Sequence, residues 1–180
     1  MNEIDLIYQC QSNNRKAQTE LYQLYKDRLF ALSLKYCKNT ADAEDVLQES
    51  FITIFSKIKQ YQARGSFEGW LKRIIINKSI DKYRENKLKF LPVIEDQIED
   101  VTIDDNLVNN SSLDTLLKVI QELPDRYRLV FNLYEMDGYS HQDISEMMQI
   151  SVGTSKSNLH RAKLNLKKKL EKQFKTKQYG

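Results

Sequence analysis

The chain contains little glycine or proline, with five and two of these residues in 180. A turn-rich β architecture depends on both residue types, so their scarcity favours long helices and predicts an all-α fold. No apolar run is long enough to span a bilayer, and the N-terminus lacks the basic-then-apolar layout of a signal peptide. We therefore expect a cytoplasmic protein with no membrane insertion.

Residues that usually carry catalysis or bind metals are also scarce. Cys10 and Cys37 are the two cysteines, and they lack the spacing of a metal site, so we expect ordinary reduced thiols. The two histidines, His141 and His160, fall in one predicted pair of C-terminal helices. A phosphate-cradling glycine loop and a nucleophile elbow are both missing from the sequence. The sequence thus predicts no catalytic residues, no metal, no cofactor and no enzymatic activity.

The net charge of +3 conceals a strong asymmetry along the chain. Residues 91–112 contain six acidic residues and no Lys or Arg, whereas from Lys156 onward nine basic residues stand against the single acid Glu171. A basic end of this kind attracts polyanions. The charge alone does not distinguish DNA from RNA or from an anionic lipid surface.

Hydrophobic periodicity divides the chain into two small helical domains joined by a flexible acidic linker. The domains are predicted over residues 1–86 and 113–180, and the linker, which has no sustained period, over 87–112. In the first domain, an inward stripe including Leu21, Leu24 and Leu29 predicts one helix ending near Tyr36. The next helix, with Thr40 as its expected cap, runs over 41–60, and another follows over 67–84.

The segment Ser140 to Leu170 is the most informative part of the sequence. Ser140 and Ser151 can each cap a short helix, and Asp143 is placed to complete a capping box with Ser140. Inward positions recur at helical spacing on both sides of a tight turn at Gln149 and Ile150. The outer side of the second helix and its flanks carry the remaining residues: Thr154, Lys156, Ser157, His160, Arg161 and Lys163.

That arrangement is typical of a helix-turn-helix, in which the second helix enters the DNA major groove with its first turns against base edges. The alternative reading is a solvated amphipathic helix pair. A capped first helix, a short turn and a polar leading edge together favour DNA recognition.

Two blocks of the sequence resemble the bacterial sigma factors. One is DAEDVLQESFITIF (Asp42 to Phe55) followed by SFEGWLKRIIINKSIDKYR (Ser66 to Arg84), and it is similar to conserved region 2. The other, Leu123 to Leu166, is similar to region 4. The pair, in this order and at this separation, resembles the short extracytoplasmic-function (group 4) sigma factors of the sigma-70 family. The resemblance covers nearly the whole chain.

The resemblance implies a polymerase contact and a proximal promoter contact in the first domain. An acidic, polar helix side would grip the clamp helices of the largest polymerase subunit, although it could also be a solvated helix side. The residues concerned are Asp42, Glu44, Asp45, Gln48 and Glu49. The next helix would read the promoter element nearest the start site and help to melt it, and the loop from Tyr61 to Phe67 would capture an extruded base. The residues of this helix that the resemblance implies are Trp70, Lys72, Arg73, Asn77, Lys78, Asp81 and Arg84. Trp70 is at least as suited to the core, and Asp81 could pair with Lys78 or Arg84 along the helix.

The resemblance also implies that the C-terminal helix-turn-helix reads the distal promoter element. Lys156, Ser157, His160 and Arg161 would lie at or near base edges, with Thr154 and the run from Lys163 to Lys169 near phosphates. His160 could equally be an ordinary surface residue, and His141 is expected at the surface. Three positions depart from the family pattern: Ser145 stands where Ala is usual, Ser155 where Val is usual and Asn158 where Arg is common.

The implied partners are core RNA polymerase, through its clamp helices and flap, promoter DNA and an anti-sigma factor. The acidic linker would thread into a positively charged channel near the polymerase active site. Two other classes of function stay open at this point: a helix-turn-helix regulator that binds DNA without polymerase, and an enzyme acting on nucleic acid, for which no catalytic residues are found.

Overall fold

The computed structural model describes residues 2–87 and 111–178, so the predicted linker lies almost wholly outside the described residues. Within the described residues all regular structure is helical, as the composition predicts. The chain divides into two compact units, residues 1–81 and 82–180, which are described separately below. The division falls inside one helix, and the predicted domain ends at 86 and 113 stay predictions.

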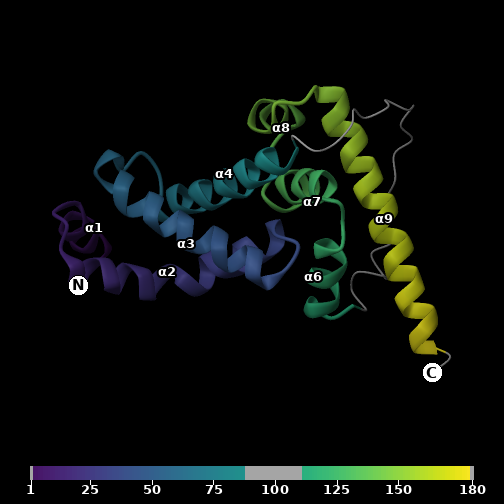
Figure 1. Ribbon diagram of the computed structural model, residues 1–180, viewed down its shortest axis with the longest axis horizontal. Coiled ribbons are helices and arrows are strands. Elements are labelled where there is room, and N and C mark those ends of the chain that lie inside the picture. Colours follow the sequence, from purple (N-terminus) through teal and green to yellow (C-terminus); the bar gives the residue numbers. More distant parts are fainter. Residues whose placement is uncertain (1, 88–110, 179–180) are drawn as a thin grey trace. The chain divides into compact units, whose positions relative to one another are not determined.

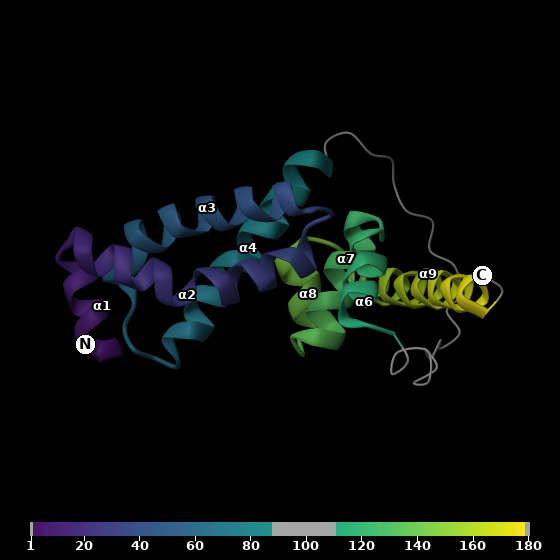
Figure 2. The same cartoon turned by 90° about the horizontal axis from the view of Figure 1, so that it is seen from below.

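The first unit is built on α1 (Glu3–Gln11), α2 (Arg15–Tyr36), α3 (Thr40–Lys57), a 3₁₀ turn η1 (Ile58–Gln60) and the greater part of α4 (Phe67–Lys87). The helices α2 and α3 pack side by side (Figures 1 and 2). Their apolar residues form a core with those of α4, including Leu21, Leu29, Val46, Ile54, Leu71 and Ile75. The predicted helix stripes are confirmed except on α2, where two members of the stripe are exposed: Leu24, which is 52% exposed at the margin of the buried side, and Arg28.

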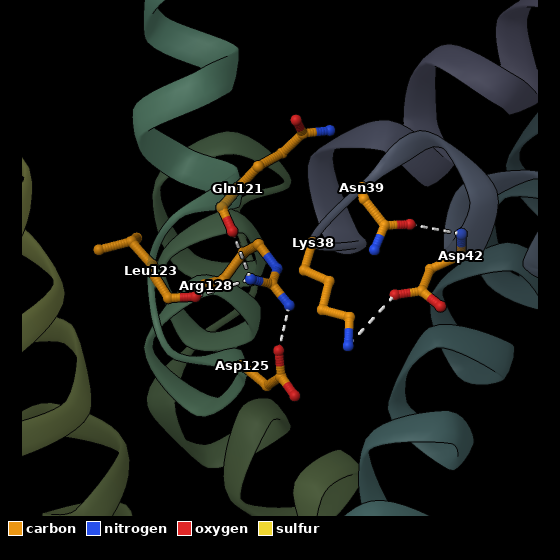
Figure 3. Close-up of polar contacts among 7 residues, drawn as sticks. All are labelled: Lys38, Asn39, Asp42, Gln121, Leu123, Asp125 and Arg128. Atoms are coloured by element: carbon orange, nitrogen blue, oxygen red, sulfur yellow. Dashed lines mark hydrogen bonds and ion pairs between the residues drawn. The ribbon is translucent and has the colours of Figure 1, made fainter.

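Asparagine begins each of the first three helices. The side chains of Asn2, Asn14 and Asn39 accept hydrogen bonds from backbone N–H groups in the first turns of α1, α2 and α3. The prediction that Thr40 caps α3 is therefore wrong. Asn39 takes that place, because its amide oxygen reaches the N–H of Asp42 at 2.8 Å (Figure 3).

The second unit contains α6 (Leu113–Gln121), α7 (Asp125–Phe131), a π-helical turn η2 (Asn132–Met136), α8 (His141–Met148) and the long α9 (Val152–Gln178). The helices α6, α7 and α8 all contact α9, which forms the spine of the unit (Figure 1). Leu159, Ala162, Leu166 and Leu170 are buried along α9, as the spacing predicts. Gly138 has a φ of 74°, a left-handed conformation that suits glycine and ends the α7–η2 segment.

Candidate nucleic-acid and protein interfaces

The outer side of α3 is an acidic surface. Glu44, Asp45, Gln48 and Glu49 are exposed, whereas Ala43, Val46, Leu47 and Ser50 between them are buried. Asp42, in the first turn, is half-buried and pairs with Lys38 at 3.8 Å (Figure 3). Ile52 lies one turn beyond Gln48 and Glu49 and is 71% exposed. The surface therefore combines exposed carboxylates with an exposed apolar side chain, a mixture that suits a protein partner.

Three of the predicted promoter-contact residues share one side of α4. Arg73, Asn77 and Asp81 are exposed and follow one another at four-residue intervals, which aligns them along the helix. Lys78 lies on the flank, half-buried, with its ammonium 3.8 Å from the Glu49 carboxylate. This side of α4 offers hydrogen-bonding and charged groups to solvent, as a nucleic-acid contact needs.

Two other predicted residues of α4, Lys72 and Arg84, are engaged in contacts with other groups of the chain. Lys72 is exposed and forms an ion pair of 2.8 Å with Glu68, whose pKa is lowered mainly by the hydrogen bond from Lys72. Arg84 belongs to the second unit, where its guanidinium donates to the main-chain carbonyl of Met147. Lys72 lies off the side that carries Arg73, Asn77 and Asp81. Arg84 follows Asp81 by three residues and lies along that side of the helix, but its guanidinium is engaged by the Met147 carbonyl.

Three aromatic residues form a cluster where the exposed loop between η1 and α4 begins and ends. Trp70 stacks on Phe67 with ring centroids 5.6 Å apart, and Tyr61 contacts both rings at 5.5 and 5.0 Å. The Tyr61 hydroxyl donates to the carbonyl of Gly65 at 2.8 Å, which holds the loop over the cluster. Phe67 is buried but Trp70 is half-buried, so Trp70 is partly core and partly accessible surface. A half-exposed ring beside a polar loop suits stacking with an unpaired base.

The predicted helix-turn-helix is present in the second unit. Ser140 and Asp143 form the predicted capping box at the start of α8. Gln149 ends α8 in the left-handed conformation with a φ of 54°, and the Ser151 hydroxyl accepts from the N–H of Thr154 at 2.9 Å at the start of α9. The Ser145 hydroxyl donates to the carbonyl of Ile150 and so gives this main-chain acceptor of the connecting turn a hydrogen bond. Local hydrogen bonds thus define both helix ends.

The predicted residues of α9 differ in accessibility. Lys156 is exposed, and Thr154, His160, Arg161 and Lys163 are half-buried. Lys163 forms an ion pair of 2.7 Å with Glu135, and Arg161 lies 3.4 Å from the Tyr127 hydroxyl. Among these residues Lys156 has the most open access to a partner.

The expectation that Ser157 lies on the outer side of α9 is wrong. Its side chain is 3% exposed and donates to the carbonyl of Thr154, because a short hydroxyl in a helix can bond back to the preceding turn. Asn158, which stands where Arg is common in the family, is also buried.

Two polar features of the second unit were missed from the sequence. The Nδ1 atom of His141 lies 2.9 Å from the hydroxyl of the buried Ser155, and the imidazole stacks on Tyr134. Burial and, to a smaller extent, Lys156 lower the pKa of His141, so its neutral form is favoured. The second feature is the buried Arg128, which bonds the turn between α6 and α7 (Figure 3). No periodicity in the sequence reports such contacts, because they depend on how neighbouring helices pack.

The residues that the structure describes contain no candidate metal site and no candidate membrane-spanning helix. Among them, no three His, Cys, Asp or Glu residues gather in a way that could hold an ion. Within the same part of the chain no helix is sufficiently long and apolar to cross a bilayer.

Two models of known protein families match the sequence of this chain. Residues 21–88 match the model of sigma-70 region 2, and residues 113–166 match that of sigma-70 region 4. These matches define the class, a sigma-70 protein that carries regions 2 and 4.

Curated relatives narrow the class. The chain is 31% identical over 176 residues to the ECF RNA polymerase sigma factor SigW of Bacillus subtilis, covering 91% of this chain and 94% of the relative. It is 30% identical over 158 residues to the ECF sigma factor SigE of Mycolicibacterium smegmatis, covering 85% of this chain and 61% of that protein. The chain belongs to the extracytoplasmic-function (ECF) sigma factors. It is accordingly a sigma factor that binds core bacterial RNA polymerase and directs promoter-specific initiation.

Among solved structures, the sigma factor RpoE from Bartonella quintana, determined in complex with the anti-sigma factor NepR, superposes with a TM-score of 0.52 at 19% identity. The match covers 85% of this chain and 96% of that one. At this identity the likeness supports the helical fold.

Proposed function

We propose that the two units of this sigma factor divide promoter recognition between them while α3 holds the chain on polymerase. The acidic surface of α3 binds the clamp helices of the largest subunit. The side of α4 formed by Arg73, Asn77 and Asp81 reads the proximal promoter element, and α9 reads the distal one. The observation that carries the proposal is that one chain exposes both an acidic α3 surface and a capped helix-turn-helix with Lys156 at its leading edge.

Promoter melting belongs to the first unit in this proposal. Opening a duplex requires a surface that binds unstacked bases better than paired ones. The half-exposed Trp70 offers a stacking surface, and the loop over it offers polar groups to an extruded base. Lys72, Lys78 and Arg73 add positive charge for the phosphates.

The proposal includes no catalytic step by this chain, since polymerase performs the chemistry. It does include an anti-sigma factor as a regulatory partner, because RpoE of Bartonella quintana was solved with NepR bound. Such a partner would act by covering the surfaces that polymerase or DNA needs.

Reconstituted transcription tests the proposal. Core RNA polymerase, the full chain or both are added to a pool of linear templates with randomised upstream sequence, and the transcripts are sequenced. We expect sequence-selective initiation that requires both components. Tight, sequence-specific DNA binding by the chain without polymerase, with no effect on initiation, would instead identify a polymerase-independent regulator.

The acidic surface of α3 is tested by reversing one charge. Asp45→Lys places a positive charge among exposed acids and is expected to lower the affinity for core polymerase about tenfold, since charge reversal at an interface costs about 1–2 kcal/mol or more. Asp27→Lys, which reverses an exposed carboxylate on α2, is the matched control and should leave the affinity unchanged. Equal losses in both variants would contradict the assignment of α3.

A further inference from the structure

A polar contact joins the two helices of the helix-turn-helix next to Lys156. His141 is the first residue of α8, and its Nδ1 atom lies 2.9 Å from the hydroxyl of Ser155 in the first turns of α9. Ser155 is 0% exposed and His141 is half-buried. The contact thus spans the two helices rather than closing a turn within one of them.

The imidazole is held on its face as well as at its edge. Tyr134, in η2, stacks on the ring with centroids 4.4 Å apart and an interplanar angle of 21°. A ring fixed by stacking presents Nδ1 to Ser155 in one direction, so little freedom is lost when the hydrogen bond forms. The segment η2 also carries Glu135, which binds Lys163 of α9 at 2.7 Å.

A hydrogen bond at this position does something that an apolar contact cannot. Apolar side chains in contact tolerate a small rotation or slide of one helix against the other, whereas a hydrogen bond weakens steeply with distance and angle. The family resemblance implies Val at the position of Ser155, so the polar pair is a departure of this chain. Its geometry fixes the rotation of the start of α9 relative to α8.

We propose that His141 and Ser155 are positioning residues that set how Lys156 meets the base edges of the distal promoter element. The inference rests on the proposed reading of that element by α9. Lys156 follows Ser155 directly, so any rotation of this turn moves the lysine with it. A hydrogen bond to a base edge requires placement within a few tenths of an ångström, whereas phosphate contacts tolerate a shift and carry no sequence information. Loss of the pair therefore costs selectivity at the bases that Lys156 reads more than it costs overall affinity.

The test is transcription by reconstituted holoenzyme from a template pool in which only the distal element is randomised. Sequencing of the transcripts gives the base preference at each position for the full-length chain and its variants. Lys156→Ala first identifies which positions depend on the lysine. His141→Ala and Ser155→Ala then remove either side of the hydrogen bond, and His141→Asn keeps a polar atom near the place of Nδ1. Gln142→Ala, at an exposed neighbour on α8, is the matched control.

We expect His141→Ala and Ser155→Ala to reduce the preference at the Lys156-dependent positions at least about fivefold, as expected for a weakened base contact. Preferences elsewhere in the element should change less than about twofold, and the double variant should be no worse than either single one. His141→Asn should restore most of the preference, and Gln142→Ala should match the wild type. If the pair had only a structural role, the base preference would fall at all positions of the element together.

Two results overturn the inference. If both alanine variants keep the wild-type preference at the Lys156-dependent positions, or lose preference equally at every position, the pair does not position Lys156. If the wild-type holoenzyme shows no preference anywhere in the distal element, the proposed reading by α9 fails and the positioning role fails with it. The first result leaves the proposed function standing, and so the two failures are distinguishable.

Discussion

The buried guanidinium of Arg128 donates a hydrogen bond of 2.7 Å to the main-chain carbonyl of Leu123 (Figure 3). The same side chain donates to the carbonyl of Gln121 at 2.9 Å and forms an ion pair with Asp125. One residue of α7 thereby satisfies the carbonyl groups at the end of α6 and in the turn that follows. A charged group in a residue that is 3% exposed is tolerated in the fold because both terminal nitrogens of the guanidinium have acceptors.

Replacing Arg128 by Ala should lower the free energy of unfolding of the second unit by roughly 2–4 kcal/mol, since buried carbonyl acceptors lose their donor. Arg128→Lys should recover only part of this loss, because a single ammonium cannot reproduce the planar guanidinium fork. Chemical denaturation followed by circular dichroism measures the change. Lys118→Ala, at an exposed position on α6, should stay within about 0.5 kcal/mol of the wild type. A loss no larger for Arg128→Ala than for this control would contradict the role of Arg128.

The cap of α3 offers a second stability test. Asn39→Ala removes the acceptor for the N–H of Asp42 and should cost the first unit about 1 kcal/mol. Thr40→Ala should cost clearly less, because the cap hydrogen bond is made by Asn39. Thermal unfolding of both variants separates the two residues, and a larger loss for Thr40→Ala would show that the start of α3 is misassigned.

The comparison of Asn39 with Thr40 shows where reasoning from the sequence reaches its limit. Helical spacing predicts buried apolar positions correctly, such as Val46 of α3 and Leu166 of α9, because burial of apolar side chains in the core is favourable. The caps at Ser140 and Ser151 were also predicted, because they depend on residues only three positions away. Asn39 and Thr40 are both good caps, and spacing alone does not choose between neighbours.

Other features depend on side-chain contacts that the spacing of apolar residues does not show. Ser157 was expected outside because it is polar, yet its hydroxyl bonds within its own helix and the residue is buried. The contact between His141 and Ser155 joins residues on different helices, and no periodicity reports it. The roles of the site residues in binding polymerase and DNA stay predictions, since they concern partners rather than the fold of this chain.

The lowered pKa of His141 predicts a pH dependence of the second unit. Burial is the main cause, Lys156 and Lys163 act in the same direction, and Glu135 opposes them. When the folded pKa is below the ordinary value of 6.5, the unfolded state binds the proton more readily. Stability is therefore fully present above pH 6.5 and is lost as the pH falls from there through the folded pKa.

Denaturant unfolding of the chain between pH 7.5 and about 5 measures this loss. In His141→Asn, which lacks the titrating group, the stability should vary less over the same range. Asp143, whose pKa is lowered by its hydrogen bonds with Ser140, titrates below this window and does not interfere. An unchanged pH dependence in His141→Asn would show that another group is responsible.

The central claim is that one chain, held on polymerase, reads two separated promoter elements with its two units. The most direct measurement is selection of transcribed templates from a pool randomised across the whole upstream region, with the full chain and core polymerase together. The account predicts two short blocks of enriched sequence at a fixed separation, with Asn77→Ala weakening only the block nearer the start site and Lys156→Ala only the farther one. A single enriched block, a variable separation, or the same loss in both blocks from either variant would contradict it.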